Sequence, residues 1–492
     1  MLGWIADSRR ESRSLIRSEK YLKSLDDERS VWLKGKRIKV YEHEAFQGTL
    51  QTISALFDML DDPVMQKQVG YPSPKTGEYV HTAFLVPKGP TDLQQRKAAF
   101  ESWSEATDGM MSRLSDYARS RLAGWYAARK QLSRHYRDFS EKITRYYETA
   151  RDQNRFITIV QRDVQINRSK QYDERCFEEA GLLRVTKKTT EGVYVSGAKM
   201  IATAAPYTND FLVYPVMKLN QAQKSAANLF IVPADAKGLH IVCRESYAKP
   251  LSEKNDFPLS AQFDEMDALL IFDQVLIPWE HVLLLESPEG IWEVKTNPHS
   301  ASLAYHQALI RLKTKLQFIT GLACKIADTI GCTQFLHVQD KLGELIGQVE
   351  TIHAILLAAE SEGRSIEDGV YLPRFSAIET GRNLGAFYYP RAIEILQLIA
   401  AGGLIQVPAS IEDFQSALSP LMKTYFRGAN LQAEKRVRLF KLAWDVIGSP
   451  FASRHELYER FYAGDPIRNR AAQYLSSNKR LLLTKIEKYL SN

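Results

Sequence analysis

Cysteine is scarce in this 492-residue chain, which contains four of these residues and no CxxC pair. So few thiols in so long a chain do not form the disulfide framework of a small secreted domain. Cys324 and Cys332 lie in an apolar stretch with helical periodicity, where buried structural thiols are typical. The low cysteine content therefore predicts a reducing, cytoplasmic setting.

Long apolar runs are also missing, since none approaches the roughly 18 residues needed to span a membrane. The first residues, Met1–Ala6, are followed at once by Asp7 and Arg9 instead of by an apolar signal core. The net charge is +7, but the basic residues are spread among acidic ones and form no block interleaved with aromatics. We therefore expect neither a membrane span nor a nucleic-acid partner, and we attribute the positive excess to a solvated surface.

Several motifs that carry familiar chemistry are absent. The chain has no GxGxxG, Walker A, HExxH or GxSxG pattern, which makes a Rossmann dinucleotide site and a P-loop poor hypotheses. The adjacent carboxylates Asp26–Asp27 and Asp61–Asp62 lie at turns and fit solvated helix caps better than acid–base pairs. No metal site is expected.

Helical periodicity dominates the first third of the chain. A helix is predicted from the spacing of Leu50, Ile53 and Leu56, with Pro63 beyond its end. Arg96 and Phe100 are four residues apart in a second predicted helix, so they lie on one face. Residues 31–38 are predicted to form a short hairpin with Gly35 in the turn.

Between residues 180 and 285 the period changes to two. Residues 184–195 are typical of a hairpin, and further strands are predicted at 211–216, 228–233, 239–243 and 268–273. Close spacing of short strands favours a barrel or a sandwich, and helices resume after residue 300. The predicted fold class is α+β: an N-terminal α-helical domain (1–152), a middle β-barrel (153–290), and a C-terminal helical bundle (291–492) that ends in a helical arm.

Few chemical candidates remain once the absent motifs are set aside. Arg96 interrupts an apolar helix face, and Gln165 and Arg168 belong to the helix-to-strand junction at 157–169, where a pocket is expected. Residues 203–209 form a loop of small side chains that permits close approach of a flat ligand to the backbone. For Arg96 and Arg168, a surface ion pair explains the residue better than a site does.

The chain resembles the large, oxygenase component of 4-hydroxyphenylacetate 3-hydroxylase, a family with acyl-CoA dehydrogenase-like architecture. The resemblance covers nearly the whole chain, and each of its motifs is short. Their number and order carry the identification. The matching segments are 21–29, 96–103, 109–117, 165–168, 197–206, 263–268, 277–282 and 453–466.

The resemblance implies a cytoplasmic homotetramer that takes FADH2 from a separate NAD(P)H:flavin reductase. In this family the reduced flavin reacts with O2 to give a C4a-hydroperoxide that oxygenates an aromatic substrate, while the protein excludes water. An arginine and a tyrosine one helical turn apart, with a later histidine, contact the substrate hydroxyl. Matched residue by residue, these fall on Arg96, Phe100 and Ile159. The flavin-contacting positions fall on Gln165, Arg168, Thr203 and Ala204.

Two of these matches depart from the family pattern. Phe100 lacks the tyrosine hydroxyl and Ile159 replaces a titratable group, a loss of roughly 2–4 kcal/mol per preorganised donor. We therefore predict an FADH2-dependent monooxygenase that acts on a small, aromatic, biosynthetic substrate other than a standard phenol. Two alternatives stay open: a flavin- or ligand-binding member without hydroxylase activity, and a CoA-thioester dehydratase of the same fold. The dehydratase needs a cysteine pair near Arg96, and no cysteine precedes Cys176.

Overall fold

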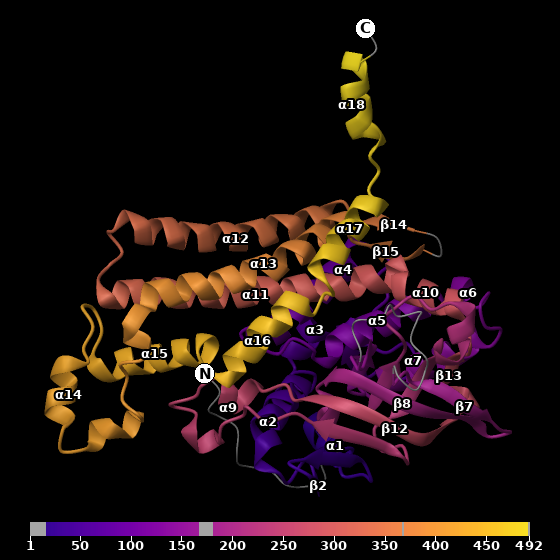
Figure 1. Cartoon of the computed structure of the whole chain (residues 1–492), viewed down its shortest axis with the longest axis horizontal. Helices are drawn as coiled ribbons and strands as arrows, with labels where there is room; N and C mark the ends of the chain where they lie inside the picture. The colour runs from indigo at the N-terminus through magenta and orange to yellow at the C-terminus, as the bar shows by residue number, and fades with distance from the viewer. Residues whose placement is uncertain (1–15, 167–180, 367–368, 491–492) are drawn as a thin grey trace.

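The computed structural model describes residues 16–166, 181–366 and 369–490. Helices fill the first third of the chain, two sheets occupy the middle, and long helices follow (Figure 1). The helices of this first third are α1 (Arg17–Lys23), α2 (Glu44–Asp58), α3 (Met65–Val69), α4 (Pro90–Glu105), α5 (Ser115–Ala127), α6 (Arg129–Leu132) and α7 (Phe139–Asp152).

Helix α2 forms because its sequence provides a cap and an apolar face. The His43 ring accepts a hydrogen bond from the backbone N–H of Ala45, which satisfies one donor at the helix start. Leu50 and Ile53 lie on the face that is buried against the rest of the chain. The helix predicted here is confirmed, and it ends at Asp58, ahead of Pro63.

The strands form two main sheets. The seven-stranded sheet has the order β2-β1-β11-β12-β8-β6, with β7 also beside β8, and the four-stranded sheet has the order β13-β10-β9-β5. Two small pairs, β3 (Gly70–Pro72) with β4 (Tyr79–His81) and β14 (Arg364–Ser365) with β15 (Tyr371–Leu372), stand apart. The strands of the main sheets are β1 (Ser30–Leu33), β2 (Lys36–Ile38), β5 (Ile157–Val160), β6 (Arg162–Asp163), β7 (Arg184–Lys188), β8 (Gly192–Thr203), β9 (Asp210–Val213), β10 (Leu229–Pro233), β11 (Leu239–Cys243), β12 (Asp267–Pro278) and β13 (Val282–Leu284).

The described strands do not form the closed β-barrel that the strand spacing predicts. A barrel closes only when its first and last strands pair, whereas β2 and β6 end the larger sheet and β13 and β5 end the smaller one. Gly197, with φ of 133°, lies on β8 between the part that pairs with β7 and the part that pairs with β6. The predicted strands and the hairpins at 31–38 and 184–195 are confirmed.

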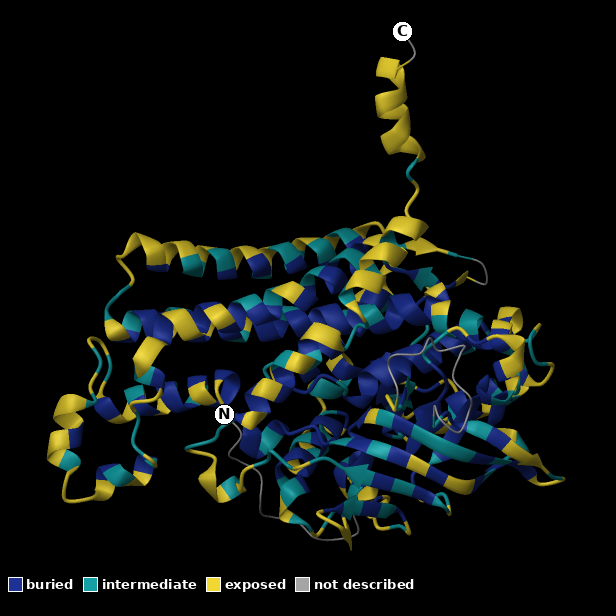
Figure 2. Cartoon of the chain, in the orientation of Figure 1, coloured by how far each residue is buried: buried dark blue, intermediate teal, exposed yellow. Residues whose placement is uncertain are grey.

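The C-terminal helices are organised around α11. Asn297 caps its start by accepting hydrogen bonds from the N–H groups of His299 and Ser300, and Gly331, with φ of 72°, ends it. Figure 2 shows α11 largely buried, whereas α18 extends from the body with an exposed surface. The helices of this part are α10 (Pro288–Thr296), α11 (Pro298–Ile330), α12 (Leu336–Ser361), α13 (Phe375–Ala400), α14 (Ser419–Tyr425), α15 (Ala433–Ile447), α16 (Pro450–Phe461), α17 (Pro466–Ser476) and α18 (Arg480–Leu490).

A glycine allows α5 to lie directly against α11. A Cβ on Gly124 would come within 2.3 Å of the Cα atom of Ser300, so only glycine fits at this crossing. The Ser300 hydroxyl also donates a hydrogen bond of 3.1 Å to the carbonyl of Arg121. These contacts fix the position of α5, which carries several of the residues discussed below.

One described helix, α12 (Leu336–Ser361), is long and apolar enough to cross a membrane by length and composition alone. The core helices of soluble proteins meet the same criterion. One face of α12 packs here against α11 and α13.

Candidate functional site

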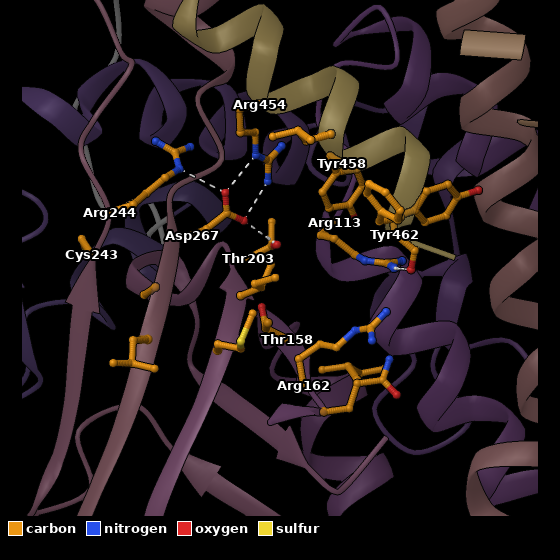
Figure 3. Close-up of a pocket in the computed structure, with 18 of the residues that line it drawn as sticks. Arg113, Thr158, Arg162, Thr203, Cys243, Arg244, Asp267, Arg454, Tyr458 and Tyr462 are labelled. Carbon is orange, nitrogen blue, oxygen red and sulfur yellow. Dashed lines mark hydrogen bonds and ion pairs between the residues drawn. The ribbon is translucent and has the colours of Figure 1, made fainter. Parts of the chain in front are cut away.

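A cavity of about 1110 Å³ lies where the larger sheet, α5 and α16 meet (Figure 3). The strands contribute residues from β5, β6, β8, β11 and β12, so segments far apart in the sequence share one wall. The lining residues with a bearing on the chemistry of the cavity are Arg113, Tyr117, Thr158, Ile159, Arg162, Gln165, Thr203, Arg244, Asp267, Arg454, Tyr458 and Tyr462.

A carboxylate at the start of β12 links the sheet to α16. Asp267 accepts two hydrogen bonds from Arg454, at 2.8 and 2.9 Å, and one from Arg244 at 3.1 Å. Thr203 at the end of β8 donates a further hydrogen bond of 2.7 Å. Burial alone would raise the pKa of Asp267, but the two guanidinium charges hold it well below its usual range. The carboxylate therefore stays ionised and ties α16 to the cavity wall.

Arg113 and Tyr117, hereafter the α5 pair, form a cation–aromatic contact at the start of α5, and both residues line the cavity. The guanidinium carbon of Arg113 lies 4.0 Å from the centre of the Tyr117 ring, and its Nη2 donates a 3.3 Å hydrogen bond to the carbonyl of Tyr462. The backbone N–H of Arg113 donates to Glu265 at 2.6 Å. Arg113 lies in the turn that precedes α5 and Tyr117 lies in its first turn, so the contact joins this turn to the start of the helix.

Arg96 and Phe100, which the resemblance assigns to the substrate, do not line this cavity. Both are buried on α4, and the Arg96 guanidinium donates to the carbonyls of Thr82, Ala83 and Leu85 and to the Ser120 hydroxyl. The ring of Phe100 lies 5.1 Å from the guanidinium carbon. Arg96 thus binds α4 to neighbouring segments of the interior.

The other predicted positions divide into three groups. Ile159, Gln165 and Thr203 line the cavity, although they come from separate segments. Ala204 follows Thr203 in a left-handed conformation, with φ of 61°, and is buried beside the cavity. Arg168 lies outside the described residues. The structure therefore brings together the strand and loop candidates, and it separates them from the α4 pair.

The residue-by-residue match missed the α5 pair, although the signal was present in the sequence. The segment 109–117 contains an arginine and a tyrosine four residues apart, the spacing that the resemblance requires. This pair also retains the hydroxyl that Phe100 lacks. Thr158, Arg162 and the α16 residues Arg454 and Tyr458 were missed as well, because only folding brings them to the cavity.

The cavity has groups suited to a flavin. Its volume of about 1110 Å³ is slightly above the roughly 300–1,000 Å³ usual for small-molecule sites. Tyr458 and Tyr462 line the cavity, and their buried hydroxyls have no hydrogen-bond partner within the described ranges. Gln165 and Thr203 add an amide and a hydroxyl. This combination fits a flat aromatic group with polar edges.

The fold is acyl-CoA dehydrogenase-like, and the cavity has the size and the polar groups that a flavin needs. The models for the N-terminal and C-terminal parts of 4-hydroxyphenylacetate 3-hydroxylase match residues 17–284 and 296–490. The chain therefore belongs to the 4-hydroxyphenylacetate 3-hydroxylase family, and it is the oxygenase component of a flavin-dependent monooxygenase with FAD as cofactor.

Individual relatives agree with this assignment. A 4-hydroxyphenylacetate 3-monooxygenase oxygenase component from Thermus thermophilus is 34% identical over 466 residues, which are 94% of each chain. A monooxygenase from Streptomyces globisporus that acts on a carrier-protein-bound chlorohydroxyphenyl amino acid is 33% identical, over 94% of this chain and 87% of that protein. A crystal structure of an oxygenase component with FAD and 4-hydroxyphenylacetate has a TM-score of 0.91 and 33% identity, covering 96% of this chain and 98% of that one. A 4-hydroxybutyryl-CoA dehydratase, 22% identical with a TM-score of 0.84, shares the fold.

Proposed function

We propose that the chain hydroxylates a phenolic substrate whose hydroxyl group contacts the Arg113 guanidinium and the Tyr117 hydroxyl, with FADH2 delivered by a separate reductase. The observation that carries this proposal is the presence of Arg113 and Tyr117 among the residues that line the cavity, with the guanidinium carbon 4.0 Å from the ring centre. Gln165 and Thr203 line the same cavity. The α5 pair replaces Arg96 and Phe100 in this role.

The charge of Arg113 gives the pair a chemical function. A guanidinium beside a phenol hydroxyl stabilises the phenolate and therefore makes the aromatic ring more electron-rich. Tyr117 can donate a hydrogen bond to the same oxygen, and its ring holds the guanidinium in place. The bound reduced flavin supplies the activation of O2. The side chains of Ile159, Tyr458 and Tyr462 limit the water that reaches the reacting groups.

A substrate other than a standard phenol stays a proposal, and of its two original reasons only the one on β5 is kept. Phe100 no longer argues for it, because Tyr117 provides a hydroxyl at the cavity. Strand β5 has no titratable side chain, and its residues Thr158 and Ile159 line the cavity. We propose that Arg113 activates the substrate without an imidazole from this strand, which favours phenols that ionise readily.

The test supplies the protein with FADH2 from a generic NAD(P)H:flavin reductase and offers a panel of para-substituted phenols. Hydroxylated product is measured by liquid chromatography and mass spectrometry, with catalase present to remove free peroxide. We expect a catechol from at least one phenol, and its yield falls about 10–100-fold in Tyr117→Phe. A matched control, Tyr79→Phe, removes a hydroxyl outside the residues that line the cavity and leaves the yield unchanged.

A specific result would refute the assignment of the substrate site. If Tyr117→Phe hydroxylates like the wild type and Phe100→Tyr improves the yield, then the α4 pair and not the α5 pair holds the substrate. Binding of FAD and of phenols without product from any of them would instead support the ligand-binding alternative.

A further inference from the structure

We propose that Asp267 is a positioning residue that fixes the Thr203 hydroxyl as a hydrogen-bond acceptor toward the cavity, so that the site distinguishes reduced from oxidised FAD. The two forms differ in hydrogen bonding, because reduction places an N–H on the central flavin ring where the oxidised ring has a lone pair. This inference rests on the proposed function in one respect, since it concerns the FADH2 that a separate reductase delivers.

The hydroxyl of Thr203 has already used its only proton. A threonine hydroxyl donates one hydrogen bond and accepts through its lone pairs. Thr203 ends β8 at the cavity, and its Oγ1 donates a hydrogen bond of 2.7 Å to Oδ1 of Asp267 (Figure 3). A ligand in the cavity therefore meets the acceptor side of this oxygen.

Asp267 cannot take the opposite role in this hydrogen bond. An ionised carboxylate accepts but does not donate, and Arg454 and Arg244 hold the pKa of Asp267 well below its usual range. Oδ1 also accepts from Nη2 of Arg454 at 2.8 Å, and Oδ2 accepts from Nε of Arg454 at 2.9 Å and from Nε of Arg244 at 3.1 Å. Through the carboxylate, the two arginines set the direction of the Thr203 hydroxyl.

A second threonine of the cavity is held in the same sense. The hydroxyl of Thr158 on β5 lies 2.7 Å from that of Thr208, and Thr208 donates to the carbonyl of Ala204 at 2.9 Å. Because Thr208 uses its only proton on that carbonyl, the proton between the two threonines belongs to Thr158. Both cavity threonines therefore present lone pairs to a ligand.

Burial makes a mismatch at these oxygens costly. Thr158 and Thr203 are each 4% exposed, so little water reaches them once a ligand covers the wall. A buried acceptor that faces another acceptor loses its hydrogen bond and keeps its desolvation penalty. The hydroxyls of β5 and β8 thus favour a ligand with an N–H group and disfavour one with a lone pair at the same place. Such a wall retains reduced FAD and releases the oxidised form.

The ratio of two dissociation constants, oxidised over reduced, measures this discrimination. Binding of FAD and of anaerobically reduced FAD is followed by ultrafiltration, with no phenol present. A tenfold ratio corresponds to a shift of about 30 mV in the midpoint potential of the bound flavin, a two-electron couple, and potentiometry checks it independently. Reduced FAD is also the more anionic form, and Arg113 and Arg162 line the cavity, so the wild-type ratio includes an effect of charge. The change of the ratio in variants isolates the hydroxyl.

Thr203→Val removes the hydroxyl, keeps the shape of the side chain and leaves the ion pairs of Asp267 in place. It should lower the ratio about 3–30-fold, whereas Thr203→Ser should keep the ratio. Asp267→Asn should lower it at least as far as Thr203→Val, because the amide group donates to Thr203 and turns its proton toward the cavity. The matched control is Thr186→Val, which removes an exposed hydroxyl of β7 outside the cavity lining and leaves the ratio unchanged.

A merely structural role of Asp267 would not produce this result. An unfolded fraction of Asp267→Asn binds neither form of FAD, which weakens both apparent affinities alike and leaves their ratio unchanged. The inference is overturned by a wild-type ratio in Thr203→Val or in Asp267→Asn. A ratio that falls in Thr158→Val and not in Thr203→Val also overturns it, because the acceptor would then be independent of Asp267.

Failure of the proposed function is a separate outcome. It appears as no hydroxylated product from any phenol while the ratios of the variants follow the expectation above. Conversely, hydroxylation that depends on Tyr117 together with a wild-type ratio in Thr203→Val would leave the substrate site intact and remove the role of Asp267.

Discussion

Replacing Asp267 with asparagine tests how α16 is held against the cavity. The substitution keeps the shape of the side chain and removes the charge that pairs with Arg454 and Arg244. Breaking one partner of a buried ion pair costs about 3–5 kcal/mol. We expect about 3 kcal/mol, the lower end of that range, because Arg244 keeps Asp264 at 2.6 Å and Arg454 keeps Glu265 at 3.3 Å.

The expected change can be measured by differential scanning calorimetry. A loss of 1 kcal/mol lowers the Tm by about 2–4 °C in domains of 150–250 residues, and the effect shrinks as the unfolding entropy grows with length. For a chain about twice that size, a loss of 3 kcal/mol corresponds to a fall of about 3–6 °C. The control is Asp273→Asn on the same strand, where the side chain is exposed and the Tm should not change.

The pH dependence provides an independent check on the same residue. The folded pKa of Asp267 is depressed, so its contribution to stability is present above the unfolded pKa of about 4 and is lost as the pH falls below it. The difference in Tm between the wild type and Asp267→Asn should therefore narrow below about pH 4. A Tm for Asp267→Asn within 1 °C of the wild type at pH 7, or a difference that does not change with pH, would refute the reasoning.

Three further predictions concern α4 and α5. Arg96→Met should lower the Tm by several degrees and leave the KM for phenols unchanged, because Arg96 contacts interior carbonyls. A raised KM with an unchanged Tm would instead place Arg96 at the substrate. Gly124→Ala should destabilise the protein by about 1–3 kcal/mol, because the added methyl group would collide with Ser300. Urea denaturation measures this loss, and wild-type stability of the variant would contradict the close crossing of α5 and α11. Burial raises the pKa of Asp116 to about 7, so the stability of the folded protein should fall as the pH rises from about 4 to about 7. Asp116→Asn should flatten the dependence of the Tm on pH in that window. An Asp116→Asn profile parallel to the wild type would show that the carboxyl does not titrate there.

The sequence predicted most elements of the fold, because helices and strands follow from local periodicity. The hairpin at 31–38 has its turn at Lys34 and Gly35, both with positive φ, as a glycine in that position suggests. Closure of the barrel could not be predicted in the same way. Strand spacing is equally compatible with open sheets, and the pairing of β1 with β11 joins residues more than two hundred positions apart.

Only part of the candidate site could be predicted, because the sequence does not show which distant segments meet. Gln165 and Thr203 were found because each carries a recognisable local segment. Arg96 and Arg113 each precede an aromatic residue by four positions. Spacing alone does not show which of the two pairs faces the cavity, so the sequence could not exclude Arg96. The carbonyls of η1 (Thr82–Phe84), which turn Arg96 inward, are visible only after folding.

The proposed role of the α5 pair is to position a phenol for oxygenation. It is tested most directly by a single turnover in which protein with anaerobically reduced FAD and a phenol is mixed with 18O2. For the wild type, we expect one 18O atom in the hydroxylated product and little hydrogen peroxide. In Tyr117→Phe and Arg113→Met the same oxygen should appear mainly as hydrogen peroxide. Stoichiometric peroxide with no labelled product from the wild type, or full labelling in both variants, would contradict it.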